Sequence, residues 1–407
     1  MIERYLNIAR EVIDLSLKQG AEQVSVSLAN ATSFQLEVRN QNIEALKEAG
    51  SSGIHVTLAK NQKRSTLSSN DFRLETLEPL IRSTLEALPL MGEDPFYTLP
   101  DPKLQGKAEI DLQFRDPNFE KMASTEKINE LMLLEKEALS IDSRLQTEEI
   151  SFSDSISYMV HGDSNGFLEG CSKTLCSQGV SMFAEDGGEE TEGSSQSLNT
   201  GRKQSDGWYS SSRFRKDLEP REDLARKAGE RTLRKLGSVK PKSCEVPVVF
   251  STEMAQSFLG SLASAMMGDN VFRKHSFLKD SLGETVANPE IRLSDEPLLP
   301  GKLGSRHYDN EGVKATPLML IDQGKLLSFM CSTYSANKLD RQSTGHAGGI
   351  SNLMLKPGSY SDEELIASID NGLYLTGMSG QGVNLTTGDY SRGAQGLWIR
   401  KGKLAEP

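Results

Sequence analysis

The first ninety residues change from a helical to an alternating hydrophobic pattern and back again. Residues 2–18 place apolar side chains three and four positions apart and end before Gly20, which predicts an amphipathic helix. Apolar and polar residues then alternate in three runs, which predict strands over 24–28, 34–38 and 54–58. Helical spacing returns over 72–88. This order predicts a small α+β domain over residues 1–90.

Prolines crowd the next segment, residues 91–109, and predict an extended linker. Beyond it, apolar spacing predicts a helix over 128–139 and a strand, broken by a bend, over 150–160. Asn165-Gly166 is a strong hairpin-turn signal, and alternation resumes at 180–184. The middle of the chain is therefore expected to be rich in strands.

Residues 185–207 are acidic, rich in Gly, Ser and Thr, and have no hydrophobic period. They fit either a mobile loop or a solvated hairpin tip. Pro220 then opens a helical pattern that ends at Gly237. We expect a middle domain over residues 110–240, built from strands with helices.

The C-terminal third begins with a strand-like run over 246–250 that leads directly into a helix from Thr252. Short apolar runs separated by glycine turns follow, including the turn at 322–325. Ser361 and the Glu three residues later form a capping box that starts a late helix. Residues 241–407 are thus predicted to form a mostly antiparallel β domain with a few helices, and the whole chain is α+β.

Composition narrows the functional classes. The chain has 407 residues with a formal net charge of -11, so a protein that coats DNA or an anionic membrane is not expected. No run approaches the roughly 20 apolar residues that span a bilayer, and charges interrupt residues 1–20, which excludes a signal-peptide core. Four cysteines in so long a chain indicate reduced thiols and a cytoplasmic protein.

Three glycine-rich segments in the C-terminal third are the candidates for chemistry: 309–312, 343–349 and 387–394. Glycine lets a backbone approach a ligand or another chain closely, but tight packing of β-turns produces the same composition and is the favoured interpretation. Asp389 and Arg392 can likewise form a structural ion pair with each other.

Metal and nucleophile signatures are missing. The five histidines are His55, His161, His275, His307 and His346. None has a second His within helical reach, and a single His is more often a hydrogen-bonded structural group than a ligand. There is no GxSxG elbow and no phosphate-binding glycine loop. Spacing gives no support to a site built from His275, His346 and carboxylates.

At these residues the chain resembles the TldD/TldE (PmbA) family, and most of all its TldE/PmbA branch. The matching sequence segments are FRKHSFL at 272–278, DNEGV at 309–313, YSANKL at 334–339, STGHAGG at 343–349 and TGDYSRGA at 387–394. The resemblance covers nearly the whole chain. It implies a cytoplasmic peptidase system in which a TldD subunit pairs with a TldE subunit. Relatives usually continue beyond the last strand, so the C-terminal domain looks shortened, with an open sheet edge expected there.

The resemblance also implies where zinc should be. TldD-type chains carry HExxxH on the helix that follows the first strand of the C-terminal domain. In this chain Gly260 and Ala265 stand at the two His positions and Ser261 stands at the Glu position. Gly and Ala have no donor atoms, and Ser is a poor general base beside a carboxylate. The TldD cysteine ligand near the C-terminus has no counterpart, because no Cys follows Cys331. We therefore expect no zinc in this chain and zinc in a TldD-type partner.

The leading hypothesis is a non-catalytic subunit. It would complete the substrate chamber of a heterodimer and admit unfolded peptide, which can bind as an added strand. His346 and Arg392 are the candidates for the cavity or interface, together with the small-residue helix face of Gly260, Ser261 and Ala265. No nucleic acid and no membrane partner is expected, and a homodimer is a further expectation for the isolated chain.

Two alternatives stay open. The chain can be a metallopeptidase in its own right, with ligands such as His275, His346 and Glu311. It can also be an adaptor that regulates other proteins, as the family's label "modulator of DNA gyrase" suggests.

Overall fold

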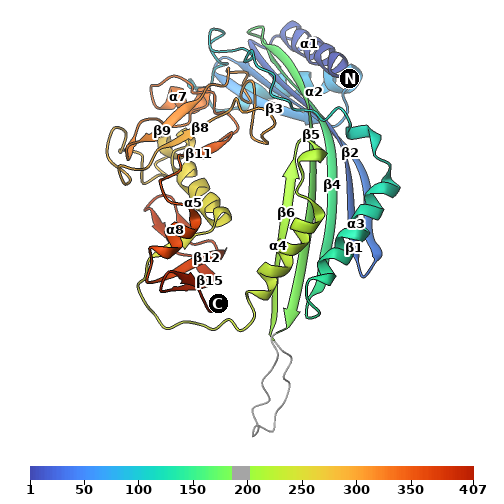
Figure 1. The fold of residues 1–407 in the computed structure, drawn as a ribbon. Coiled ribbons are helices and arrows are strands. Elements are labelled where there is room, and N and C mark those ends of the chain that lie inside the picture. The colour runs from blue at the N-terminus through green and yellow to red at the C-terminus, as the bar shows by residue number, and fades with distance from the viewer. Residues whose placement is uncertain (186–201) are drawn as a thin grey trace, which may run out of the picture.

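A computed structural model describes residues 1–185 and 202–407 (Figure 1). Its largest feature is a six-stranded antiparallel sheet of order β3-β2-β1-β4-β5-β6. The strands are β1 (Gln23–Arg39), β2 (Asn42–Lys60), β3 (Lys63–Ser69), β4 (Gln146–Asp163), β5 (Leu168–Glu185) and β6 (Lys203–Ser212). We refer to this sheet, its helices and the segment 91–116 as the sheet unit.

Four helices cover the sheet in two pairs. These are α1 (Ile2–Lys18) and α2 (Leu74–Ala87), then α3 (Ser124–Ser140) and α4 (Arg221–Leu233), with single-turn helices η1 (Leu88–Leu90), η2 (Phe119–Lys121) and η3 (Arg215–Asp217) beside them. The first pair packs on Val24, Val26 and Leu28 of β1, and the second pair packs on Phe34, Leu36 and Val38. All six residues are even-numbered, so both apolar cores lie on the same face of the strand.

The structure confirms the predicted helices and corrects two strand predictions. Runs 24–28 and 34–38 belong to one strand, β1, and the predicted break within 150–160 is wrong, because β4 is continuous. Polar residues between the apolar runs stay in the ladder because backbone hydrogen bonds do not depend on side-chain polarity. Segments predicted as separate units share this one sheet, and the division into domains stays a prediction. Most of the predicted loop or tip at 185–207 lies outside the described residues.

The second part, which we call the C-terminal unit (residues 243–407), has shorter elements. One sheet has the order β10-β9-β8-β11 and another β16-β15-β12-β7, and β13 pairs with β14. The strands are β7 (Val248–Phe250), β8 (Leu293–Asp295), β9 (Leu318–Asp322), β10 (Lys325–Leu326), β11 (Leu353–Leu355), β12 (Asn371–Ser379), β13 (Val383–Asn384), β14 (Asp389–Tyr390), β15 (Gly393–Arg400) and β16 (Lys403–Leu404). The helices are α5 (Thr252–Ala265), α6 (Gly268–Phe272), α7 (Thr333–Lys338) and α8 (Asp362–Ala367).

Several local predictions in the C-terminal unit are confirmed. β7 runs into α5, and a glycine turn at 322–325 joins β9 to β10. Ser361 caps α8: its hydroxyl accepts from Glu364 N at 3.2 Å, and its own N–H donates to the Glu364 carboxylate at 2.8 Å. Across the described ranges every helix is too short or too polar to cross a bilayer.

Candidate functional site

Two of the glycine-rich segments, 309–313 and 343–349, fold against each other around a buried carboxylate. Asp309 is 2% exposed, and its carboxylate accepts from the N–H groups of Glu311 and Val313 at 2.9 and 3.0 Å. It also accepts from Ala347 N at 2.9 Å. Burial raises the pKa of Asp309, although the three amide donors oppose that shift. These hydrogen bonds hold the two segments against each other.

His346 is part of a second buried network and does not face a cavity. Its Nε2 lies 3.1 Å from the carboxylate of Asp295, and its Nδ1 lies 2.8 Å from Thr344 O. Ser351 donates to the same carboxylate from both its N–H and its hydroxyl. Burial would raise the pKa of Asp295, but the His346 and Ser351 hydrogen bonds outweigh it and lower the pKa overall. These hydrogen bonds hold the loop of residues 346–351 against β8, which carries Asp295.

The alternative ligand set does not come together. His275 is exposed, His346 is buried against Asp295, and the Glu311 carboxylate accepts from Thr333 N at 2.8 Å at the start of α7. In residues 1–185 and 202–407, no three His, Cys, Asp or Glu side chains form a group suited to a metal ion. The donors present therefore do not fit a zinc ion held by these three residues.

Helix α5 carries the three small residues that stand at the expected zinc positions. A Cβ on Gly260 would meet nothing within 4 Å, so this side of the helix is open. The Ser261 hydroxyl donates to Ser257 O at 3.2 Å, and Ala265, about one helical turn after Ser261, is completely buried. Two of the three positions have no side-chain donor and the third hydroxyl is already bonded, so these residues do not fit a zinc ion.

The third glycine-rich segment lies beside α5. The Phe258 ring packs between Phe250 and Tyr390, with ring centroids 5.5 and 5.2 Å apart. Arg392 is partly exposed and donates from Nε to Ser379 O at 3.3 Å, whereas Asp389 accepts from Thr387. The ion pair considered between Asp389 and Arg392 is thus not formed in the described part of the chain.

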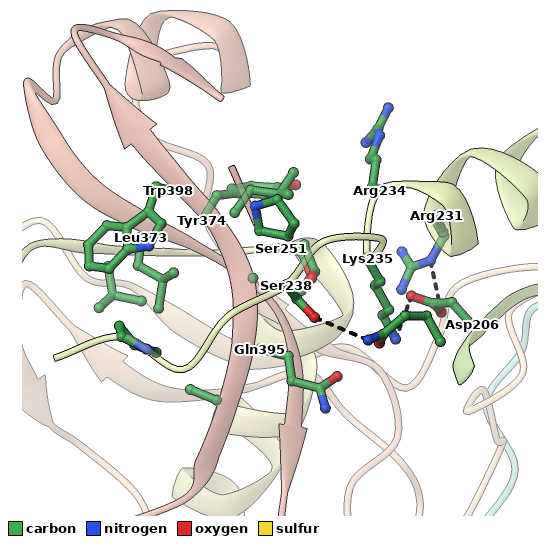
Figure 2. Close-up of a pocket in the computed structure, with 18 of the residues that line it drawn as sticks. Asp206, Arg231, Arg234, Lys235, Ser238, Ser251, Leu373, Tyr374, Gln395 and Trp398 are labelled. Carbon is green, nitrogen blue, oxygen red and sulfur yellow. Dashed lines mark hydrogen bonds and ion pairs between the residues drawn. The ribbon is translucent and has the colours of Figure 1, made fainter. Parts of the chain in front are cut away.

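A cavity of about 960 Å³ separates α4 and β6 from β12 and β15 (Figure 2). Its apolar wall includes Val248, Leu373 and Trp398, which are aligned across β7, β12 and β15. The facing wall is charged: Arg231 pairs with Glu253 at 3.0 Å, and Lys235 pairs with Asp206 at 2.9 Å. The Arg231–Glu253 ion pair joins the sheet unit to the start of α5.

Sequence reasoning missed this cavity, and none of the five candidate residues lines it. The two walls come from residues near 206–235 and near 373–398, and no short motif spans that separation. Among the lining residues, Glu253 is the one that a local pattern could have suggested, because it directly follows the predicted strand-to-helix junction. The candidates His346, Arg392, Gly260, Ser261 and Ala265 remain predictions for a partner interface.

Comparison with known proteins now gives the class of protein. Residues 117–236 match the PmbA/TldA metallopeptidase central domain, and residues 243–407 match the PmbA/TldA metallopeptidase C-terminal domain. A metalloprotease PmbA homolog from Buchnera aphidicola is 32% identical over 99% of this chain and 87% of its own. Metalloprotease PmbA from Escherichia coli is 28% identical over 100% of this chain and 88% of its own. The chain belongs to the PmbA/TldD family, whose members carry metalloprotease names.

Solved structures of known proteins share the fold of this chain. A protein named as a modulator of DNA gyrase from Bacteroides thetaiotaomicron superposes with a TM-score of 0.90 at 28% identity, over 98% of this chain and 88% of its own. TldE from Thermococcus kodakarensis superposes with a TM-score of 0.83 at 18% identity, over 98% of this chain and 89% of its own, which is a likeness of fold.

Proposed function

We propose that this chain is the TldE/PmbA-type subunit of a cytoplasmic two-chain metallopeptidase that degrades or processes unfolded peptides. A TldD-type partner would hold the zinc ion and the general base, and this chain would complete the substrate chamber. The observation that carries the proposal is α5. Gly260 and Ala265 offer no donor atom, and the Ser261 hydroxyl is bonded to Ser257 O.

The surface around α5 supports the partner role. Gly260 faces open space, Phe258 is 41% exposed, and the partly exposed Arg392 follows β14, whose Tyr390 contacts the Phe258 ring. Aromatic residues and Arg are enriched at interfaces that another chain covers. His346 is 1% exposed, so it would influence an interface through loop packing.

The first experiment is the zinc content of the chain purified without chelator, alone and after co-expression with a TldD-type chain. We expect negligible zinc in the lone chain, a single zinc ion per pair, and peptide cleavage by the pair alone. Zinc that survives dialysis in the lone chain would contradict the proposal and favour ligands outside those recognised here. Capture of gyrase without a peptidase subunit would favour the adaptor instead.

A pair of arginine variants tests the surface. Arg392→Ala should weaken complex formation about tenfold, the size of loss expected when a hot-spot Arg of an interface is truncated. Arg82→Ala is the matched control, because Arg82 is an exposed Arg on α2 with a 63% exposed side chain. Equal affinities for both variants would remove Arg392 from the proposed interface.

A further inference from the structure

The two units meet at α7, where Asn337 donates to Phe96 O at 2.9 Å, and along a seam whose residues do not line the cavity. On the C-terminal side it consists of residues 301–314, and on the sheet side of segment 104–114 and the adjoining ends of β4 and β5. Three backbone hydrogen bonds cross it: Gly301 N donates to Leu112 O at 2.9 Å, Gly106 N to Gly312 O at 3.1 Å, and Lys314 N to Leu104 O at 2.9 Å. In Figure 1 the C-terminal unit approaches the sheet at the end where α7, β8 and β9 lie.

One buried and one partly buried cation of the sheet unit donate hydrogen bonds to carbonyl groups of the C-terminal unit. Arg213 is 6% exposed and donates to Leu303 O at 2.5 Å, and Lys173 donates to Ser305 O at 3.4 Å. Burial lowers the pKa of both side chains, which is the cost of their desolvation. Phe114 packs against both cations and against the His307 ring. Charged donors fix the position of this loop more firmly than neutral ones would.

At Gly312 the backbone of the C-terminal unit lies directly against a ring of the sheet unit. It has a φ of +80°, and a Cβ at this position would lie 2.6 Å from the Phe167 ring. The same ring packs edge-on against Tyr308, with centroids 5.0 Å apart. Gln105 bridges the units through one amide nitrogen, which donates to the Asp163 carboxylate and to Glu311 O. Only a residue without a side chain fits between these groups.

The seam includes the glycine-rich segment 309–312 and is bonded to the glycine-rich segment 343–349. Asp309 accepts from Ala347 N, and Arg306 donates to Gly345 O and Gly349 O at 3.4 and 2.6 Å. Gly348 packs on Asn310 so closely that a Cβ would lie 2.4 Å from its amide nitrogen. A displacement of segment 343–349 is therefore transmitted to residues 301–314.

We infer that segments 301–314 and 343–349 together form a latch that sets the position of the C-terminal unit on the sheet. The latch controls the separation of α4 from β12 and β15, and so the width of the cavity between them. At the cavity itself the Arg231–Glu253 ion pair joins the two walls. The role of these glycine-rich segments is thus to position one unit on the other, which goes beyond the function proposed above and does not depend on it.

Amide hydrogen exchange on the isolated chain tests the latch. Gly312→Ala should place a methyl group against Phe167 and raise exchange about tenfold or more in peptides covering 104–114 and 299–315. Peptides from β1 and β2 should keep their wild-type protection. The matched control is Gly380→Ala, which has a φ of +83° but open space around a Cβ, so it carries the same backbone strain without the clash.

Two further measurements make the result decisive. Small-angle scattering should show a larger radius of gyration for Gly312→Ala than for Gly380→Ala. Faster seam exchange with an unchanged radius, or unchanged seam exchange, would overturn the latch. If Gly312→Ala loses protection throughout, Gln105→Ala decides: selective loss at the seam supports the latch, and wild-type exchange there overturns it.

Discussion

The sheet unit and the C-terminal unit both have an apolar core, but they differ in the length of their strands and in how their loops are organised. The sheet unit has strands of up to 19 residues, and its helices cover one face of the sheet with apolar side chains. The C-terminal unit has strands of two to nine residues, and buried carboxylates such as Asp295 and Asp309 organise its loops. Apolar burial is distributed over many contacts, whereas a buried charge depends on a few specific donors.

The largest expected effect lies in the C-terminal unit. Asp309→Ala would leave three amide N–H groups without an acceptor, which should cost about 4 kcal/mol of unfolding free energy. Urea unfolding, followed by a probe in the C-terminal unit, measures the loss. Asp309→Asn keeps one acceptor oxygen and should recover part of it. A loss below about 1 kcal/mol would mean that the network is not what organises these loops.

The matching substitution in the sheet unit should cost slightly less. Leu36 is completely buried between α3, α4 and the sheet, and its truncation in Leu36→Ala should cost about 3 kcal/mol. Leu46, its cross-strand neighbour on β2, is 46% exposed, so Leu46→Ala should cost well under 1 kcal/mol. Paired residues of antiparallel strands share one face, so similar losses would contradict a core in which α3 and α4 cover β1 but not β2 at this level.

His161 on β4 is a buried ionisable residue of the sheet unit, so buried titratable groups are not confined to the C-terminal unit. Burial lowers the pKa of His161 to about 4, below its value in the unfolded chain. Between those two values the unfolded state binds more protons, so stability is complete above about pH 6.5 and falls as the pH decreases toward 4. The loss between pH 7 and pH 4.5 should be about 2 kcal/mol.

Urea unfolding of wild type and His161→Gln at several pH values isolates this term. The difference between the two proteins should shrink as the pH falls, because the variant has no titrating ring. The buried acids Asp309 and Glu311, whose pKa values are raised by burial, act in the opposite direction in both proteins and cancel. Parallel pH profiles would show that His161 is protonated at no cost.

The same contrast explains how far the sequence could be interpreted. Alternation and helical spacing identified α1, α3 and α4, because each presents a regular apolar face to the sheet. The continuity of β1 through residues 29–33 escaped prediction, because polar residues there interrupt the apolar runs while the ladder to β4 continues. Periodicity reports burial of side chains, and it is silent where backbone pairing alone sustains a strand.

For the candidate site, the sequence identified candidate residues but could not predict which of them lie together in the fold. The small residues of α5 could be identified by resemblance to a motif of fixed spacing. His346 could not be assigned to a cavity or a loop, because its partner Asp295 lies 51 positions away. The cavity walls are separated still further along the chain. Contacts of that separation depend on how the two units pack, which no local pattern encodes.

The smallest expected effect concerns a short local sequence pattern in the C-terminal unit, the capping box of α8. Ser361→Ala removes the hydroxyl that accepts from Glu364 N, and loss of such a cap should cost about 1 kcal/mol. Because α8 is a short exposed helix, we expect the loss to appear as faster exchange of the Leu365 and Ser368 amides, with little change in the global transition.

Ser368→Ala is the control, since that hydroxyl donates to Leu365 O near the end of the same helix and caps no N–H group. If both variants exchange alike, the capping box contributes nothing and α8 is held by its contacts alone. If Ser361→Ala alone frays the helix, then a four-residue signal suffices to start α8. The C-terminal unit would then be unpredictable only where its loops close around buried charge.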